Sequence, residues 1–447
     1  MGFWLFGKES RQMKHLPLAA VAVMLVVTVT MGLGVAPLSA TTTSGEHAET
    51  EAFEPQSVTP STHSPQPTHT IEANSGDDAV LNTLALPTET IERSDLRHQY
   101  ADLGPASEFD TGVTTDRLVT RSIVAELDAA DSDDERLDRI DSELSELETA
   151  VIDLEDRQRE AIDAFNQETL EPREFVEELA VIHLKAATYR ERMNTLEEYA
   201  ETIDGDALSD DRLQRTEYDL RMLESPLRAH AVSVLRGEQP ANKIMIETSS
   251  DELALTAIED ETYIREVNRQ GLRESGTPTL SADQPEEMTQ EQYPVLWDRS
   301  TSWSSDGIDS VFMMSVNYPG GELRTFIDGV SEQTFIEHKQ LPLDGVNTGE
   351  TTNKLQDGLN VTVDQTYAGG PFRVTVTDAE TDEPVEATVT VGQDGRESQP
   401  VGTVDEDGIV WAISPREPFT VTVLGEGTSA AFVDVTPQPP EAVTAGQ

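Results

Sequence analysis

The side chains able to catalyse a reaction or bind a metal ion are few and scattered in this sequence. Beyond residue 116, the regions expected to fold contain three histidines, His183, His230 and His338. None belongs to a His-Glu-x-x-His pair, and the sequence contains no Gly-x-Ser-x-Gly elbow and no phosphate-binding loop. We interpret His183 and His230 as partly packed surface side chains. The sequence therefore predicts no catalytic, cofactor-binding or metal-binding residues, and a protein that is not an enzyme.

Carboxylates are abundant but do not form a recognisable metal site. The densest group consists of Asp131, Asp133, Asp134 and Glu135. Its spacing lacks the central glycine and the terminal glutamate of a calcium-binding loop. Because the chain has 85 acidic residues, chance pairs of carboxylates are expected, and a secreted hydrolase stays an alternative. One modification motif occurs, Asn360-Val361-Thr362, which makes Asn360 a candidate for N-glycosylation in an exported protein.

The charge of the chain is extreme, because 31 basic residues balance only part of the acidic ones and leave a net charge of −54. Repulsion of this size opposes a compact state in dilute buffer, but in molar salt the Debye length falls to about 3 Å. Scarce lysine, abundant Asp and Glu, and small side chains resemble the composition of proteins from extreme halophiles such as haloarchaea. A nucleic-acid partner is disfavoured, since no basic patch is present to neutralise phosphates.

The N-terminal region contains the one strongly apolar stretch, Leu16 to Leu38, which follows Lys8, Arg11 and Lys14. The stretch is long enough to cross a hydrocarbon core of about 30 Å as a helix, and its basic flank predicts that the body lies outside the cytoplasm. Small residues near its end also permit cleavage as a signal peptide. Residues 1–40 are therefore a signal peptide or a membrane anchor. The chain has no cysteine, so no disulfide supports the fold.

Residues 41–76 are rich in Thr, Ser and Pro and lack apolar periodicity, which predicts a disordered linker between the apolar stretch and the folded body. This linker contains three more histidines, His47, His63 and His69. A metal role for them is not expected, because nothing there fixes ligand geometry.

Residues 77–240 are predicted to form a coiled-coil-like bundle of α-helices. Apolar residues alternate at spacings of three and four from Leu137 to Phe165 and again from Phe175 to Ile203. The short connection between these runs makes the two helices antiparallel, with Pro172 in the first turn of the second. A homodimer formed through the same heptads is the alternative.

Two further helices complete the predicted bundle. A third run follows the break at residues 204–206 and extends from Leu213 to Val234, with Ser209 as its N-cap and Pro226 as a kink. A shorter helix, Leu118 to Leu127, packs beside the hairpin.

Residues 241–358 are predicted to be a mixed α/β or β-rich domain. Lys243 to Thr248 and Leu253 to Ile258 alternate with a period of two and form a strand pair. A short helix from Thr262 to Arg273 and a linker from Thr277 to Gln292 follow. Three strands come next, Ser310 to Tyr318, Glu322 to Asp328 and Thr334 to Leu341.

Residues 359–436 show the most regular β pattern, and residues 437–447 are predicted to be a disordered tail. The stretch contains a strand ending in Asp378, an alternating strand at Val389 and Val391, and an Asp407-Gly408 hairpin turn. This pattern resembles the carboxypeptidase-regulatory-like, or transthyretin-like, β-sandwich modules. The resemblance implies an immunoglobulin-like sandwich that binds or supports rather than catalyses. Trp411 is expected in or at the edge of its core.

The predicted fold class is therefore a multidomain α+β protein, and the whole arrangement resembles uncharacterised haloarchaeal envelope proteins. We expect a non-enzymatic cell-envelope protein without cofactors. Its expected partners are the membrane, through Leu16 to Leu38 if this stretch is uncleaved, and an envelope protein or glycan. An extracytoplasmic sensory subunit that works with a membrane partner is the alternative.

If salt screening sustains the fold, dilution from about 3 M to about 0.1 M salt lengthens the Debye length to about 10 Å and restores the repulsion between carboxylates. We expect circular dichroism to show a marked loss of secondary structure over this range. A spectrum that does not change would contradict the halophilic interpretation.

Overall fold

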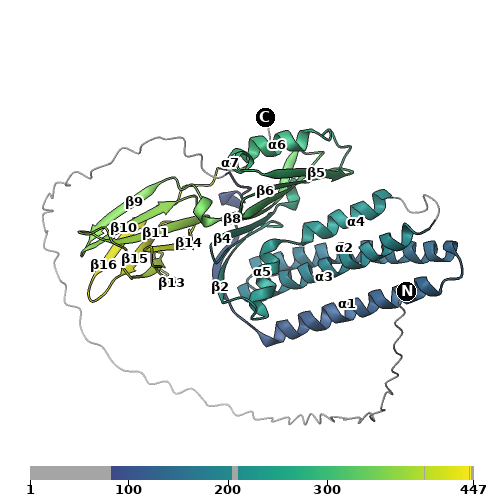
Figure 1. The fold of residues 1–447 in the computed structure, drawn as a ribbon, viewed down its shortest axis with the longest axis horizontal. Coiled ribbons are helices and arrows are strands. Elements are labelled where there is room, and N and C mark those ends of the chain that lie inside the picture. Colours follow the sequence, from purple (N-terminus) through teal and green to yellow (C-terminus); the bar gives the residue numbers. More distant parts are fainter. Residues whose placement is uncertain (1–81, 204–209, 397, 442, 444–447) are drawn as a thin grey trace, which may run out of the picture. The chain divides into compact units, whose positions relative to one another are not determined.

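The computed structural model describes residues 82–203, 210–396, 398–441 and 443 (Figure 1). The predicted signal peptide or anchor, the Thr/Ser/Pro-rich linker and the predicted N-cap Ser209 lie outside these residues. Every helix in the described part of the chain is too short or too polar to cross a bilayer. The described residues form a mixed α+β structure with helices in the middle of the chain and a β-sandwich at the C-terminal end.

Five helices make up the helical region: α1 (Leu103–Ala129), α2 (Asp133–Asn166), α3 (Pro172–Ala200), α4 (Asp210–Leu223) and α5 (Pro226–Leu235). The two predicted heptad seams are confirmed as the inner faces of α2 and α3, and their apolar side chains are buried in one core with those of α4 and α5. The described chain therefore buries these seams within itself.

Two predicted boundaries in the helical region are wrong. The helix expected from Leu118 to Leu127 is much longer, and Leu118 itself is 58% exposed on it. Pro226 does not kink a continuous helix but occupies the first turn of α5, after Ser225, whose hydroxyl accepts a hydrogen bond from the Arg228 amide. A proline is favourable there because the first-turn amide needs no helical partner.

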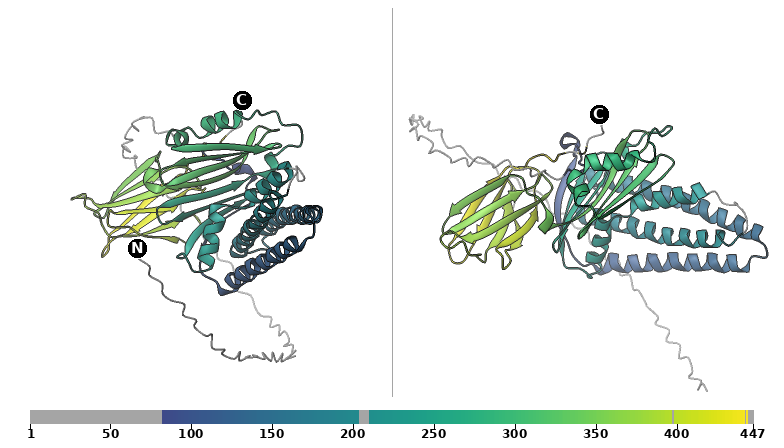
Figure 2. Two further views of the ribbon diagram at one scale, coloured as in Figure 1. Left: turned by 45° about the vertical axis from the view of Figure 1, so that its right-hand side comes forward. Right: turned by 45° about the horizontal axis from the view of Figure 1, so that its top comes forward.

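An antiparallel sheet of eight strands packs against these helices, with the strand order β1-β2-β3-β4-β8-β7-β6-β5. The strands are β1 (Arg93–Gln99), β2 (Asn242–Thr248), β3 (Leu253–Glu259), β4 (Thr262–Asn268), β5 (Ser302–Ile308), β6 (Val311–Tyr318), β7 (Gly321–Asp328) and β8 (Gln333–Pro342). Figure 2 shows the helices gathered on one face of this sheet. Apolar residues of β2, β3 and β4 join the helical core on that face.

The predicted strand pair is confirmed as β2 and β3, and the three later strands as β6, β7 and β8. The predicted helix from Thr262 to Arg273 is wrong, because this segment forms β4 and a short 3-10 turn. Both faces of β4 are covered and both bury a charged residue, Arg265 on one and Glu266 on the other. The apolar alternation that normally reveals a strand is therefore absent.

Two further segments differ from expectation. The stretch predicted as a linker, Thr277 to Gln292, contains helix α6 (Gln284–Gln292), which is followed by α7 (Pro294–Asp298). Strand β1 lies within the range assigned to the helical bundle, yet it pairs along its whole length with β2. The range predicted as the helical bundle therefore contributes a strand, β1, to the sheet, and its helices share a core with that sheet.

The C-terminal β-sandwich contains two four-stranded sheets, ordered β14-β11-β10-β9 and β13-β12-β15-β16. Its strands are β9 (Thr351–Gln356), β10 (Leu359–Gln365), β11 (Pro371–Asp378), β12 (Thr388–Gly392), β13 (Gln399–Thr403), β14 (Ile409–Ile413), β15 (Phe419–Leu424) and β16 (Ala430–Val435). Valines from both sheets fill the common core, as predicted. The sandwich begins at β9, before residue 359, and the sequence did not reveal this edge strand because its side chains are mostly exposed and polar.

The Asp407-Gly408 turn has a different role from the predicted hairpin. Gly408 adopts a φ of +74°, and a Cβ at this position would lie 2.5 Å from the carbonyl oxygen of Val376. The turn therefore requires glycine. However, β13 before it and β14 after it belong to different sheets. The turn carries the chain from one layer of the sandwich to the other.

Part of the predicted disordered tail, residues 437–447, follows a defined path. The Ala368 amide donates to the carbonyl oxygen of Gln438 at 2.7 Å, and the Thr83 amide donates to that of Glu441 at 3.2 Å. The Val443 amide donates back to the carbonyl oxygen of Thr83 at 3.1 Å. These bonds join the end of the described chain to its beginning.

Candidate functional site

The three histidines singled out by the sequence lie apart from any metal-binding group. His183 is half-buried, whereas His230 and His338 are buried, so the prediction of a surface position is wrong for His230. The Nε2 atom of His230 lies 2.7 Å from the side-chain Nδ2 atom of Asn242, and its Nδ1 atom lies 3.0 Å from Glu259. Within the described ranges, no three histidine, aspartate or glutamate side chains are grouped to hold a metal ion.

A group of buried charged side chains lies in the middle of the eight-stranded sheet, around β4 and β8. On the helix-facing side, Arg228 of α5 donates to the Glu266 carboxylate at 2.6 Å. On the opposite side, Arg265 and Lys339 contact Glu337 at 2.9 Å and 3.3 Å. All five side chains are buried. We call them the buried charge cluster.

Each carboxylate of the buried charge cluster is stabilised in its ionised form. Burial opposes ionisation of Glu337, but Lys339 and Arg265 outweigh it, so the pKa of Glu337 lies below its usual value. Burial likewise opposes ionisation of Glu266, and Arg228 overcomes it, so this pKa is also lowered. Burial lowers the pKa of Lys339 to about 8 despite the nearby Glu337.

The buried charge cluster is a structural element. The Leu84 amide and the Thr83 hydroxyl both donate to Glu337, at 2.7 Å and 2.9 Å, so the segment before β1 is fastened over one face of the sheet. None of the five side chains borders the cleft described next. A substrate in that cleft therefore has no contact with the buried charge cluster.

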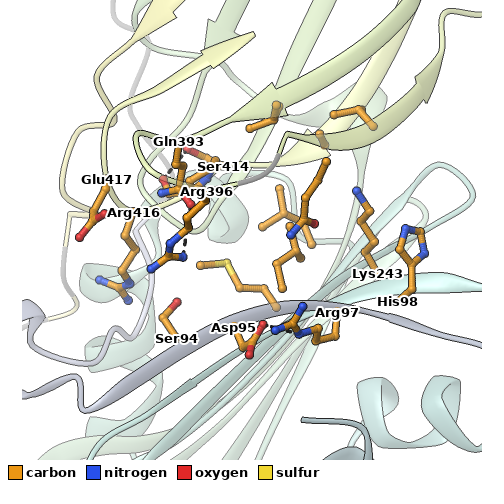
Figure 3. A pocket seen from close by; sticks show the side chains of 18 of the residues that line it. Ser94, Asp95, Arg97, His98, Lys243, Gln393, Arg396, Ser414, Arg416 and Glu417 are labelled. Carbon is orange, nitrogen blue, oxygen red and sulfur yellow. Dashed lines mark hydrogen bonds and ion pairs between the residues drawn. The ribbon is translucent and has the colours of Figure 1, made fainter. Parts of the chain in front are cut away.

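The candidate functional site is a cleft of about 1400 Å³ between the β1–β2 end of the eight-stranded sheet and the sandwich. Figure 3 shows His98 and Lys243 on the sheet, and Arg396 and Arg416 on the sandwich side. Eight consecutive residues, Ile91 to His98, line this cleft. Side chains of a strand alternate between two faces, so an unbroken run of lining residues means that the edge of β1 itself borders the cleft.

Two contacts connect the sheet to the sandwich beside the cleft. Arg416 makes a bidentate pair with the buried Glu247 of β2, with one bond of 2.8 Å. The hydroxyl groups of Tyr263 and Tyr367 lie 3.0 Å apart and are both buried. Buried charges and hydroxyl groups need a hydrogen-bond partner, and these four side chains have theirs only when the sheet and the sandwich are in contact. The two contacts therefore hold the walls of the cleft together.

Two cations of the cleft have no carboxylate partner among the described residues. Lys243 donates to the carbonyl oxygen of Pro400, and Arg396 donates to Gln393 at 3.4 Å. Neither forms an ion pair within the described part of the chain, whereas Arg97 pairs with Asp95 at 2.8 Å. His98 lies opposite Lys243 in the strand register. Burial and Lys243 lower the pKa of His98, and burial lowers the pKa of Lys243.

Acidic side chains also line the cleft, but they make up a smaller share of its lining residues than of the whole chain. The lining carboxylates are Glu92, Asp95, Glu168 and Glu417. The lining cations are Arg93, Arg97, Lys243, Arg396 and Arg416. Five cations and four carboxylates therefore line the cleft, in a chain whose acidic residues outnumber the basic ones by 85 to 31. This surface differs in charge from the rest of the protein.

The sequence did not reveal this cleft, because its residues come from separate segments and are of ordinary types. A usable signal existed in the stretch Arg93 to His98, which contains two arginines and a histidine in an otherwise acidic chain.

The structure also places two residues that the sequence analysis named, Trp411 and Asn360. Trp411 is half-buried and lines the cleft, but the expectation that it packs against the sandwich core is wrong: its neighbours Val410 and Ala412 do so, whereas Trp411 packs against the cluster that contains Tyr263 and Tyr367. Asn360 lies within β10, where its side-chain oxygen accepts a hydrogen bond from Asn353 at 2.8 Å.

Comparison with family models divides the chain into three matched regions. Residues 13–240, just over half of the chain, match the family described as Domain of unknown function (DUF7096). The chain belongs to this family. Residues 244–347 match the Family of unknown function (DUF7094), and residues 350–432 match the Archaeal fibronectin-III type-like domain. No curated protein and no solved structure matches the chain.

These matches refine the assignment of the C-terminal domain. A β-sandwich is confirmed, and the family that matches it is fibronectin-III-like, which leaves the carboxypeptidase-regulatory-like resemblance without support. The first family ends at residue 240 and the second begins at residue 244. Strand β1 of this DUF7096 protein nevertheless pairs with β2, so the two matched regions build one sheet.

Burial makes the stability of the protein dependent on pH through His338, which faces Glu266, Arg324 and Arg228. Desolvation lowers its pKa from 6.5 to about 4. Between these values the unfolded chain binds a proton that the folded chain excludes. The contribution of His338 to stability is therefore fully present above pH 6.5 and is lost as the pH falls toward 4. We expect His338→Gln to weaken this dependence.

Urea unfolding at several pH values, compared between wild type and His338→Gln, measures this effect. Asp219, whose pKa burial raises to about 6, acts with the opposite sign, but it contributes equally to both proteins and cancels in the difference. Parallel pH profiles for the two proteins would show that His338 is not the group responsible.

Proposed function

We propose that this protein is a non-enzymatic, halophilic envelope protein that is exported, tethered by its N-terminal apolar segment, and binds an anionic ligand in the cleft. The apolar run after three basic residues and the acidic composition support the location. The fibronectin-III-like domain and the β-rich body support a role in binding rather than catalysis. The ligand would be a carboxylate-, sulfate- or phosphate-bearing component of the cell envelope.

The observation that carries this proposal is the pair of cations Lys243 and Arg396, which line one cleft and lack carboxylate partners among the described residues. Carboxylates are so abundant in this chain that most arginines among the described residues form an ion pair with one. Lys243 is partly removed from water, and such a cation gains most from a charge-assisted hydrogen bond to an anion. An anion bound in the cleft would therefore give Lys243 and Arg396 the partner that they lack among the described residues.

Neighbouring groups strengthen the preference for an anion. Lys243 and His98 lie side by side on the sheet, and burial and Lys243 lower the pKa of His98, so a negative charge bound beside them would favour the protonated form of His98. Arg396 is exposed and extends from the opposite wall, so an anion in the cleft would meet positive groups from both sides (Figure 3). The carbonyl oxygen of Pro400 keeps Lys243 directed toward the sandwich.

The location is tested by fractionating native cells and sequencing the N-terminus of the mature protein. We expect an intact N-terminus in the membrane fraction, since the run from Leu16 to Leu38 is longer than a usual signal-peptide core. A mature start near Thr41 in the medium would replace the tether by secretion. Recovery in the cytoplasmic fraction would contradict export.

Anion binding is tested with two polymers, polyglutamate and polygalacturonate, using neutral dextran as the reference. We expect both anionic polymers to bind the full chain and the double variant Lys243→Gln, Arg396→Gln to bind at least about tenfold more weakly, which corresponds to about 1.4 kcal/mol. Lys354→Gln is the matched control, because Lys354 is an exposed cation on β9 and does not line the cleft.

Equal binding by wild type and the double variant would contradict the cleft as the binding site. Shortening of either polymer during the measurement would contradict a purely binding function. Both measurements are made at the lowest salt concentration that preserves the circular dichroism spectrum, because screening weakens the contacts being tested.

A further inference from the structure

We propose that the ligand of the cleft is an extended acidic peptide that pairs with the free edge of β1 and adds a ninth strand to the eight-stranded sheet. This inference rests on the anion-binding function proposed above and specifies its ligand class. It joins two observations, the unpaired cations of the cleft and the position of the β1 edge along it.

The edge of β1 is available for pairing. Strand β1 is the outermost strand on its side of the sheet and pairs with β2 along all seven of its residues. No other described segment forms backbone hydrogen bonds with residues 93–99. Backbone amides and carbonyls are strong hydrogen-bonding groups, and an open row of them is a ready template for another strand.

The cleft extends around this edge rather than over one face of the sheet. Residues on both faces of β1 line it, including Ser94 and His98 on the sandwich side and Arg93 on the helix side, where its guanidinium lies over Phe165. Glu168, from the turn between α2 and α3, lines the same space. A strand added beside β1 would therefore lie inside the cleft and not on the outer surface.

The charges around the edge favour an acidic peptide over a neutral or basic one. Arg97 on β1 is already paired with Asp95, so the strand itself is nearly neutral. The unpaired cations belong to the neighbouring strand and the facing wall, Lys243 and Arg396. Side chains on one face of an added strand recur about every 6.6–6.8 Å and would point toward these cations.

Strand addition also favours a peptide over an anionic polysaccharide. A peptide backbone repeats donors and acceptors at the same spacing as β1 and can satisfy its edge continuously. A polysaccharide of uronic acids would meet the cations but would lack this regular backbone pairing. The two ligand classes therefore predict different responses to changes in the peptide backbone.

The test uses the full chain and fluorescent peptides as long as β1, in which glutamate alternates with valine. Two further versions carry N-methyl groups on every second residue, one version on the glutamates and the other on the valines. N-methylation removes the amide donor and blocks pairing on one edge of a strand. We expect one version to bind at least about tenfold more weakly than the unmodified peptide and the other to retain most of the affinity.

Hydrogen exchange of β1 is the structural readout, and binding should increase the protection of its amides. A peptide with lysine in place of glutamate is the charge control and should bind weakly. Lys354→Gln again serves as the protein control, because this residue lies on β9, away from the cleft.

The outcomes separate this inference from the proposed function. Equal binding of both N-methylated peptides, still dependent on Lys243 and Arg396, would overturn strand addition and leave anion binding intact. Binding of polygalacturonate without any acidic peptide would overturn the peptide class alone. If neither ligand binds, both proposals fail.

Discussion

The charges buried at the centre of the eight-stranded sheet, Arg228, Glu266, Arg265 and Glu337, constrain everything packed around them. Breaking such a pair typically costs about 3–5 kcal/mol, because it leaves a charge that neither water nor protein satisfies. Arg228 fastens α5 to one face of the sheet through Glu266. Glu337 fastens the segment at Thr83 and Leu84 to the other face. Helices, sheet and the segment before β1 must therefore assemble together.

This constraint explains why the boundary between two sequence families is not a boundary between folding units. The regions 13–240 and 244–347 match separate family descriptions, yet β1 from the first pairs with β2 from the second. The apolar core is also continuous across that boundary, from Ile123 on α1 to Ile264 on β4. The fibronectin-III-like sandwich has its own core and is joined to the sheet by fewer contacts, among them the Arg416–Glu247 pair.

The cleft exists because of that unequal assembly. The sandwich contacts the sheet at β4 through Tyr367 and Tyr263 and at β2 through Arg416 and Glu247, and strand β1 lies beyond these contacts at the edge of the sheet. The edge strand and the sandwich wall consequently face each other across open space. In a chain so rich in carboxylates, the unpaired cations on these two walls define a surface suited to an anionic partner.

The sequence by itself determined the elements whose burial follows a single period: the helices α2 and α3 through their heptads, and the sandwich strands through alternating valines such as Val374 and Val376. It did not determine β4, where a charged residue is buried on each face, or β9, whose edge position leaves polar side chains exposed. Only the tertiary structure brought Lys243 and Arg396 together, since they lie on different domains. Periodicity records which face of an element is buried, whereas pairing between distant charges and the free edge of a strand depend on how the elements pack.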